Sequence, residues 1–228
     1  MVRQAGREEP SESREAAMAV FCESYWPPLY AFLRHRRHSP SDAQDLVQAF
    51  FVHVLDKNVL DHADREKGKL RTFLLSSLQN FLINAHERAT ALKRGGEFHI
   101  LSLDDSLTEM EAAMPSASHL DDTSYYDLTW ATSVVTLAWR NLSDALAAEG
   151  KAQWLDELKP FVAGGTAALP AQEEVAERMG VPVATLRTWI SRLRQRYRDA
   201  LRDEVAKTVA NPDEIDEELR YLHRVLVS

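Results

Sequence analysis

Hydrophobic residues recur at three- and four-residue spacing along much of the chain, which is the pattern of amphipathic helices. The N-terminal part holds three such runs, at residues 18–36, 42–55 and 70–94. Pro27 and Pro28 are expected to interrupt or kink the first run, because proline removes a backbone donor. Ser41 or Asp42 suits the N-cap of the second. The three runs predict one compact helical domain.

The pattern returns in the second half, after a stretch that is acidic, rich in serine and poor in aromatic residues. The predicted organisation is a disordered segment at 1–17, a helical domain at 18–98, an acidic linker at 99–124, a second helical domain at 125–208 and an amphipathic tail at 209–228. Leu219 and Leu222 lie on the tail's apolar stripe, which is expected to pack on the second domain or to bind a partner. Eight glycines are few for 228 residues, and strand-like alternation is scarce. The predicted fold class is therefore all-α, with two small helical domains joined by an acidic linker.

The segment from Glu173 to Arg202 has the pattern of a helix-turn-helix, in which a short helix, a tight turn and a second helix pack together. Gly180 falls where the turn favours positive φ, and Leu186 and Trp189 are expected to anchor the second helix. The residues expected to point outward are Thr185, Arg187, Thr188, Ser191 and Arg192, with Arg194, Arg196 and Arg198 extending the basic face. Such side chains contact base edges and phosphates in a major groove.

The basic helix stands out because the whole chain has a formal net charge of −8, while residues 187–202 hold six arginines and one aspartate. For DNA binding, local charge matters more than net charge. The alternative is a solvated arginine-rich helix that binds nothing.

Several functional classes are not supported. No apolar run is long enough to span a bilayer, and Cys22 is the single cysteine, so we expect a cytoplasmic protein without an internal disulfide. The histidines lack metal-ligand spacing, and neither EKGK nor RGG has the form of a phosphate-binding loop. We therefore expect no metal, no cofactor and no enzymatic activity.

The chain resembles the extracytoplasmic-function sigma factors of bacterial RNA polymerase over residues 18–208. DAQDLVQAFFVHVL is similar to their core-binding helix, and GKLRTFLLSSLQNFLINAHERATALKRGG to their promoter-melting helix. ILSLDD resembles the start of their interdomain linker, and EEVAERMGVPVATLRTWISRLRQRYRDAL their C-terminal helix-turn-helix. YDLTWATSVVTLAWRNL and ANPDEIDEELRYL resemble a subgroup with a short C-terminal extension.

The resemblance implies binding to core RNA polymerase and to promoter DNA. Docking onto the polymerase is implied for Asp42, Asp45 and Gln48. Contact with the opened −10 element is implied for Asn80, Asn84, Arg88, Lys93 and Arg94. Recognition of the −35 element is implied for Thr185, Arg187, Thr188, Ser191, Arg192 and Arg194. The acidic linker would run near the polymerase active site.

One departure concerns charge on the docking helix, where Gln44 stands in place of the family's usual glutamate. Some subgroups are thought to gain charge there by threonine phosphorylation, and Ser41 and Thr72 are the candidate acceptors here, with Ser39 also nearby. A phosphate would add about −1.5 to −2 charge. The plainer interpretation of Ser41 is an N-cap. A Ser/Thr kinase or an anti-sigma protein is accordingly a possible partner.

Two other functions compete with a sigma factor. A stand-alone helix-turn-helix regulator would use only the second domain and would bind duplex DNA by itself with a steep salt dependence. A helical adaptor would bind proteins through its amphipathic stripes and would show no promoter-dependent activity.

Overall fold

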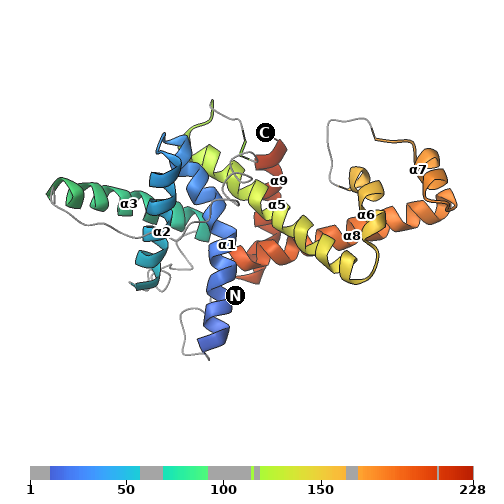
Figure 1. The fold of residues 1–228 in the computed structure, drawn as a ribbon, viewed down its shortest axis with the longest axis horizontal. Coiled ribbons are helices and arrows are strands. Elements are labelled where there is room, and N and C mark those ends of the chain that lie inside the picture. The colour runs from blue at the N-terminus through green and yellow to red at the C-terminus, as the bar shows by residue number, and fades with distance from the viewer. Residues whose placement is uncertain are drawn as a thin grey trace. The chain divides into compact units, whose positions relative to one another are not determined.

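The computed structural model describes residues 11–56, 69–91, 114–115, 119–162, 169–209 and 211–227, with the side chains of 21–55 and 69–85 in the first two ranges. The described residues form helices and no strands, which confirms the predicted all-α class (Figure 1). The elements are α1 (Ser11–His35), α2 (Pro40–Asp56), α3 (Leu70–Ala91), α5 (Asp122–Ala148), α6 (Ala152–Leu158), the 3-10 turn η3 (Lys159–Phe161), α7 (Gln172–Arg178), α8 (Val183–Thr208), the 3-10 turn η4 (Pro212–Glu214) and α9 (Ile215–Val227).

The chain forms two compact units. The first unit comprises Met1–Ser133 together with Ala206–Ser228, and the second comprises Val134–Val205. The division falls within α5 and within α8, so each of these helices contributes to both units. The C-terminal tail therefore belongs to the first unit.

The first helix, α1, continues through Pro27 and Pro28, so the interruption that the sequence allowed there does not occur. Each proline removes one helical hydrogen bond. The side chains around them offset this loss, since Leu29 and Tyr30 are 0% exposed and Tyr25 is 1% exposed. The helix also begins at Ser11, within the segment expected to be disordered, and residues 1–10 lie outside the described ranges.

The start of α2 is capped by Ser39, and neither Ser41 nor Asp42 is the N-cap. The Asp42 backbone N–H donates to Ser39 Oγ at 3.1 Å, and the Ser39 hydroxyl donates to Asp42 Oδ2 at 2.7 Å. Pro40 is the first helical residue, where its fixed φ suits the helix and its missing N–H has no partner to lose. Ser41 is thus an exposed residue within the first turn.

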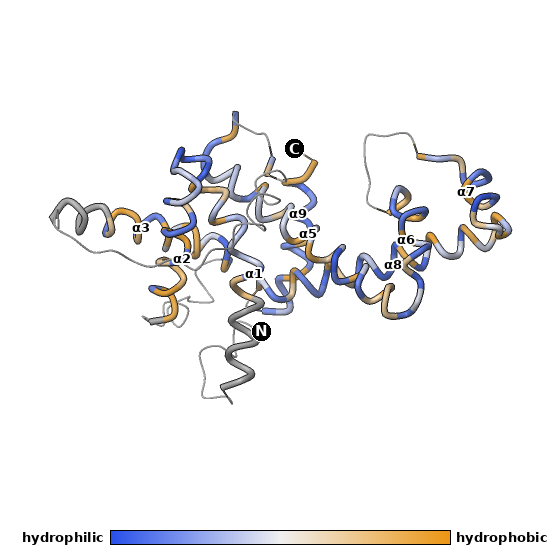
Figure 2. The backbone as a smooth tube through the Cα atoms, in the orientation of Figure 1, coloured by the Kyte–Doolittle hydropathy of each residue, from blue (hydrophilic) through white to orange (hydrophobic). Residues whose placement is uncertain are grey.

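The core of the first unit is aromatic. Phe50 of α2 lies 5.7 Å from Phe81 of α3, and Phe32 of α1 lies 6.4 Å from Tyr126 of α5, measured between ring centroids. The tail helix α9 has a strongly amphipathic sequence and buries Ile215, Glu218 and Leu222. Figure 2 shows hydrophobic residues alternating with hydrophilic ones along these helices.

The second unit has its own hydrophobic core, drawn from the C-terminal half of α5 and from α6, η3, α7 and α8. Its buried members are Leu142, Leu146, Leu158, Phe161, Val175, Ala176, Leu186, Ile190 and Leu193. Trp154 and Trp189 stack beside this core with their ring centroids 4.4 Å apart. Leu186, at 0% exposure, anchors α8 as the sequence predicted.

Candidate nucleic-acid interface

The helices α7 and α8 of the second unit meet at a short turn whose geometry depends on Gly180. This residue has φ of 65°, a conformation that costs little only for glycine, and the sequence predicted it. The Val181 N–H donates to the Ala176 carbonyl at 3.0 Å, and the Leu186 N–H donates to the Pro182 carbonyl at 3.1 Å. The turn therefore ends α7 and begins α8 within four residues.

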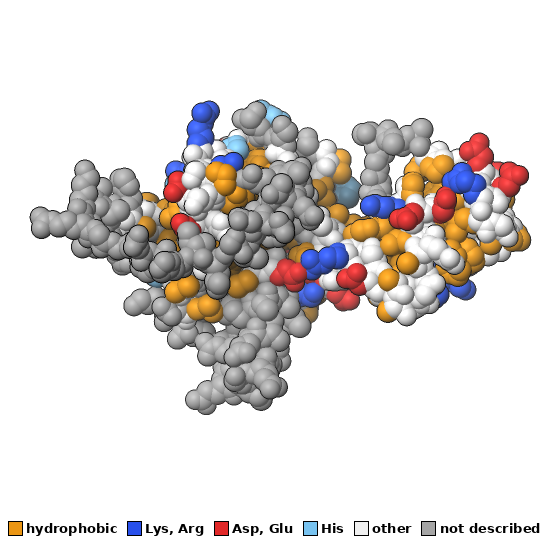
Figure 3. Space-filling model, in the orientation of Figure 1, with side chains coloured by type: hydrophobic (Ala, Val, Ile, Leu, Met, Phe, Trp, Pro, Cys, Tyr) orange, Lys and Arg blue, Asp and Glu red, His pale blue; other side chains and the backbone are white. Residues whose placement is uncertain are grey.

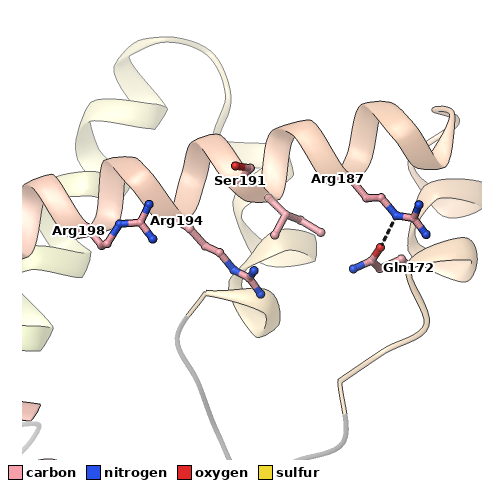
Figure 4. Close-up of a pocket in the computed structure, with 6 residues that line it drawn as sticks. Gln172, Arg187, Ser191, Arg194 and Arg198 are labelled. Atoms are coloured by element: carbon pink, nitrogen blue, oxygen red, sulfur yellow. Dashed lines mark hydrogen bonds between the residues drawn. The ribbon is translucent and has the colours of Figure 1, made fainter.

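One side of α8 carries a row of arginines, called here the arginine row: Arg187, Arg194 and Arg198, with Ser191 among them. All four residues are exposed. Their spacing places them on one face, because successive helical residues turn by about 100°. With Gln172 and Ile190 they line an open hollow of about 340 Å³, and Figure 4 shows the arginines following one another along the helix.

Two arginines of the row, Arg194 and Arg198, hydrogen-bond to neutral oxygens and so keep their charge available. Arg194 Nε donates to the Phe161 carbonyl at 3.0 Å, and Arg198 donates to Gln195 Oε1 at 2.6 Å. Among the described residues, neither forms an ion pair with a carboxylate. Arg194 and Arg198, beside the Ser191 hydroxyl, suit binding to phosphate or to a base edge.

Arg187 is oriented by α7. Its Nε donates to Gln172 Oε1 at 2.9 Å, drawn as the dashed line in Figure 4, and its terminal nitrogen lies 3.8 Å from Glu173. The bond through Nε uses neither terminal nitrogen, and a pair of arginine N–H donors is the type of group that can bind a guanine edge. Gln172 was not predicted from the sequence; its position at the first residue of α7 was the available signal.

The remaining predicted residues of α8 do not share the face of the arginine row. Arg192 is exposed but lines a second hollow of about 160 Å³, together with Trp154 and Trp189. The Thr188 hydroxyl donates to the carbonyl of Ala184, four residues earlier, at 3.0 Å. Thr185 is half-buried. The structure thus brings Arg187, Ser191 and Arg194 together and leaves the other three apart from them.

Arg196 is not part of the exposed basic face, in contrast to the sequence interpretation. Its guanidinium makes two hydrogen bonds to the Glu149 carboxylate, at 2.6 and 3.0 Å, and Lys151 Nζ lies 2.6 Å from the same carboxylate. These bonds, chiefly those from Arg196, lower the pKa of Glu149 to about 2. The charge of Arg196 is therefore used within the second unit.

The exposed face of α7 carries several acidic side chains. Glu173, Glu174 and Glu177 of α7 are exposed, and Figure 3 shows acidic side chains gathered over this helix. Arg178 of α7 pairs with Glu157 at 2.7 Å, which lowers the pKa of that carboxyl. The arginine row is consequently the part of α7 and α8 best suited to an anion.

In the first unit, α2 presents a partly apolar outward face. Asp42 is exposed, and Asp45 and Gln48 are half-buried. Val52 and Leu55, which were not among the predicted docking residues, are 51% and 37% exposed. Gln44, by contrast, is buried at 8% exposure, so this residue does not add to or subtract from the charge of the outward face.

The outward face of α3 is polar and uncharged over the described side chains. Asn80 and Asn84 are exposed and continue a row with Thr72 and Ser76 at four-residue spacing. Ile83 beside them is 59% exposed. The side chain of Arg88, and both Lys93 and Arg94, lie outside the described residues.

Two other kinds of feature, a metal site and a membrane span, are absent from the described ranges. The described His, Cys, Asp and Glu residues contain no group of three or more arranged to hold a metal ion. Among the described helices, none is both long enough and apolar enough to span a membrane.

The N-terminal helices match a family model. Residues 21–91, which cover most of α1, all of α2 and α3, match the family model of sigma-70 region 2. This match supports a member of the sigma-70 family, in which region 2 binds core RNA polymerase and promoter DNA. No curated protein and no solved structure matched the chain.

Proposed function

We propose that this protein is an RNA polymerase sigma factor of the extracytoplasmic-function group, with a short C-terminal extension, acting in the bacterial cytoplasm. It would bind core polymerase through the first unit and direct it to promoters with two DNA contacts. The match of residues 21–91 to sigma-70 region 2 carries this proposal. The arginine row of the second unit supports it, because a promoter-specific factor needs a second DNA-binding surface.

The outward face of α2 is the proposed polymerase contact. Asp42, Asp45 and Gln48 would supply polar contacts, and the exposed Val52 and Leu55 would supply apolar area. Apolar contacts with a polar surround are typical of protein interfaces. The acidic charge of this face would favour a basic surface on the polymerase.

The proposed contact with the −10 element is the uncharged row of α3. Asn80 and Asn84 offer amide donors and acceptors to the edges of unpaired bases, while Arg88, Lys93 and Arg94 would hold the adjoining backbone. Once the duplex is open, splayed bases can be bound by stacking and edge hydrogen bonds.

The proposed contact with the −35 element is the exposed N-terminal part of α8, as in helix-turn-helix proteins. Arg187, held by Gln172, would contact a guanine edge, with Ser191 beside it. Arg194 and Arg198 would contact phosphates, and Arg192, Thr188 and Thr185 would contribute at the margin of the site.

Phosphorylation is the proposed means of adjusting the affinity for core polymerase, at Ser41 on α2 and at Thr72 on α3. Ser41 and Thr72 are both exposed, and Ser39 takes the capping role that would otherwise have explained Ser41. Glutamate at either position is expected to strengthen binding to core polymerase. Unchanged affinity of both Ser41→Glu and Thr72→Glu would remove the case for a kinase and leave control to another partner, such as an anti-sigma protein.

The experiment that tests the proposal compares the free protein with its complex with core polymerase. We expect the free protein to bind core polymerase tightly and duplex DNA weakly, and the complex to bind promoter fragments selectively. The stand-alone regulator predicts the opposite: no affinity for core polymerase, and salt-sensitive binding of the free protein to a specific duplex. Native mass spectrometry and fluorescence anisotropy measure these two affinities.

A further inference from the structure

Arg71, in the first turn of α3, is a buried cation whose partners come from two other helices of the first unit. Its side chain is 8% exposed, and its Nε donates to Glu218 Oε1 of α9 at 2.6 Å. A terminal nitrogen donates to Asp127 Oδ1 of α5 at 3.0 Å. The guanidinium lies 3.9 Å from the ring centroid of Tyr221 and 5.2 Å from that of Trp130. Acidic and aromatic groups thus surround the charge.

The tail helix α9 supplies the most deeply buried member of this cluster. The Glu218 side chain is 2% exposed, and its second oxygen, Oε2, lies 2.6 Å from Lys69 Nζ. Tyr221, one turn further along α9, donates its hydroxyl to Asp127 Oδ2 at 2.6 Å. The cluster therefore joins α3, α5 and α9 through Lys69, Arg71, Asp127, Glu218 and Tyr221.

The electrostatics of the cluster favour the charged form of each cation. Burial alone would lower the pKa of Arg71, but the charge and hydrogen bond of Glu218, together with the charge of Asp127, raise it above its usual value. The pKa of Lys69 is raised against burial by Glu218 and Glu217. Arg71 is therefore a permanent positive charge that requires its carboxylates in place.

A buried ion pair adds little stability compared with a well-packed apolar pair, whereas the loss of one partner leaves an uncompensated charge. What it adds is a fixed arrangement of the groups that carry it. Here the fixed groups include the first turn of α3. Asn80 and Asn84 lie further along the same helix, in its exposed row. The tail helix thus holds one end of the helix to which we assign the −10 element.

We propose that α9 is a positioning element for the region 2 helices, in which Glu218 and Asp127 hold Arg71 and thereby keep α3 in the orientation needed to capture the opened promoter strand. The C-terminal extension would then act in strand opening, although it lies more than a hundred residues from α3 in sequence. This inference rests on the proposed sigma-factor function, and its test distinguishes a failure of the inference from a failure of that function.

The test compares Glu218→Gln with Glu217→Gln in the full-length protein. The two substitutions remove neighbouring carboxylates, but Glu217 is 63% exposed and contacts only the rim of the cluster, through Lys69 at 2.9 Å. Each variant is assayed for affinity to core polymerase and for transcription from one promoter in two forms: a fully paired duplex and the same duplex with a mismatched, already open −10 region.

We expect Glu218→Gln to lower transcription from the paired duplex by about tenfold or more, because α3 loses its fixed position when strands must be captured. On the open template, and in core affinity, it should stay within about twofold of the parent, as should Glu217→Gln in all assays, since exposed ion pairs contribute little. Glu218→Asp, which keeps the charge but shortens the side chain, should give an intermediate loss on the duplex. This variant also carries the test if Glu218→Gln does not fold.

Three results would overturn the inference. Glu218→Gln and Glu218→Asp could transcribe the duplex as well as Glu217→Gln does, which would make the cluster irrelevant to opening. Either could transcribe it better, which would make α9 a restraint. Equal losses on both templates would show a structural role only. By contrast, a parent protein that neither binds core polymerase nor starts transcription would contradict the proposed function.

Discussion

The arginine row on α8 allows a quantitative prediction. Replacing Arg187, Arg194 and Arg198 with glutamine removes three exposed charges while keeping polar side chains of similar reach. We expect the complex of this variant with core polymerase to bind a duplex carrying the −35 element more weakly and with a smaller salt dependence. The reason is that each arginine at a phosphate releases counterions from the DNA when it binds.

The magnitude follows from the contacts proposed for each arginine. Each phosphate contact adds about 0.9 to the slope of log affinity against log salt, so Arg194 and Arg198 together add about 1.8. Between 50 and 200 mM salt, one such contact corresponds to about a 3.5-fold change in affinity and two to about 12-fold. Loss of the proposed Arg187 contact with a guanine should lower discrimination at that base pair by about 1–3 kcal/mol.

The assay is fluorescence anisotropy of the labelled duplex, titrated with the polymerase complex at a series of salt concentrations. Arg196→Gln is the matched control: it removes an arginine from the same helix, but one that already pairs with Glu149. The control should leave the slope unchanged. Equal slopes for the parent and the triple variant, or an equal reduction in the control, would refute the assignment of the arginine row to DNA.

Three further predictions concern the second unit. Leu186→Ala should lower the free energy of unfolding of the second unit by about 2–5 kcal/mol, because the Leu186 side chain is 0% exposed in the core. Urea unfolding followed by tryptophan fluorescence measures this change, and a loss below about 1 kcal/mol would contradict the packing. Gly180→Ala should lower the free energy of unfolding by about 1–2 kcal/mol in the same assay. The cause is conformational alone, since φ is 65° and an added Cβ meets no atom within 4 Å. An unchanged urea midpoint would contradict the turn geometry. The pKa of Glu149 is lowered from 4.5 to about 2, so its contribution to stability is present above the unfolded pKa and is lost as the pH falls through the folded value. The stability difference between the parent and Glu149→Gln should thus narrow between pH 4.5 and 2, and a constant difference would exclude the Arg196 pair as its source.

Features set by neighbouring residues could be predicted from the sequence. Helical spacing identified the all-α class, the apolar contact of Leu186 and the turn at Gly180, because each depends on residues within a few positions along the chain. The capping of α2 is local too, but Ser39, Ser41 and Asp42 all have side chains that can cap a helix. Only the hydrogen bond from the Asp42 N–H to Ser39 Oγ shows which of them is the N-cap.

Features that depend on distant pairs could not be predicted. Arg194 and Arg196 are arginines in nearly the same sequence surroundings. Arg196 nevertheless donates hydrogen bonds to Glu149, 47 positions away, while Arg194 donates to a backbone carbonyl. The position of the tail likewise depends on the hydrogen bond between Arg71 and Glu218, which are 147 positions apart in the sequence. The amphipathic stripe of α9 predicted that one face would be covered, but it carried no information on which surface would cover it.

The central claim, that this chain directs core RNA polymerase to promoters, is tested most directly by run-off transcription. Purified core polymerase would be incubated with a library of genomic fragments, with and without the protein, and the 5′ ends of the transcripts would be sequenced. The account predicts new, discrete start sites that share two upstream elements and that disappear when the arginine row is replaced by glutamine. An identical set of transcripts with and without the protein, together with no binding to core polymerase, would contradict it.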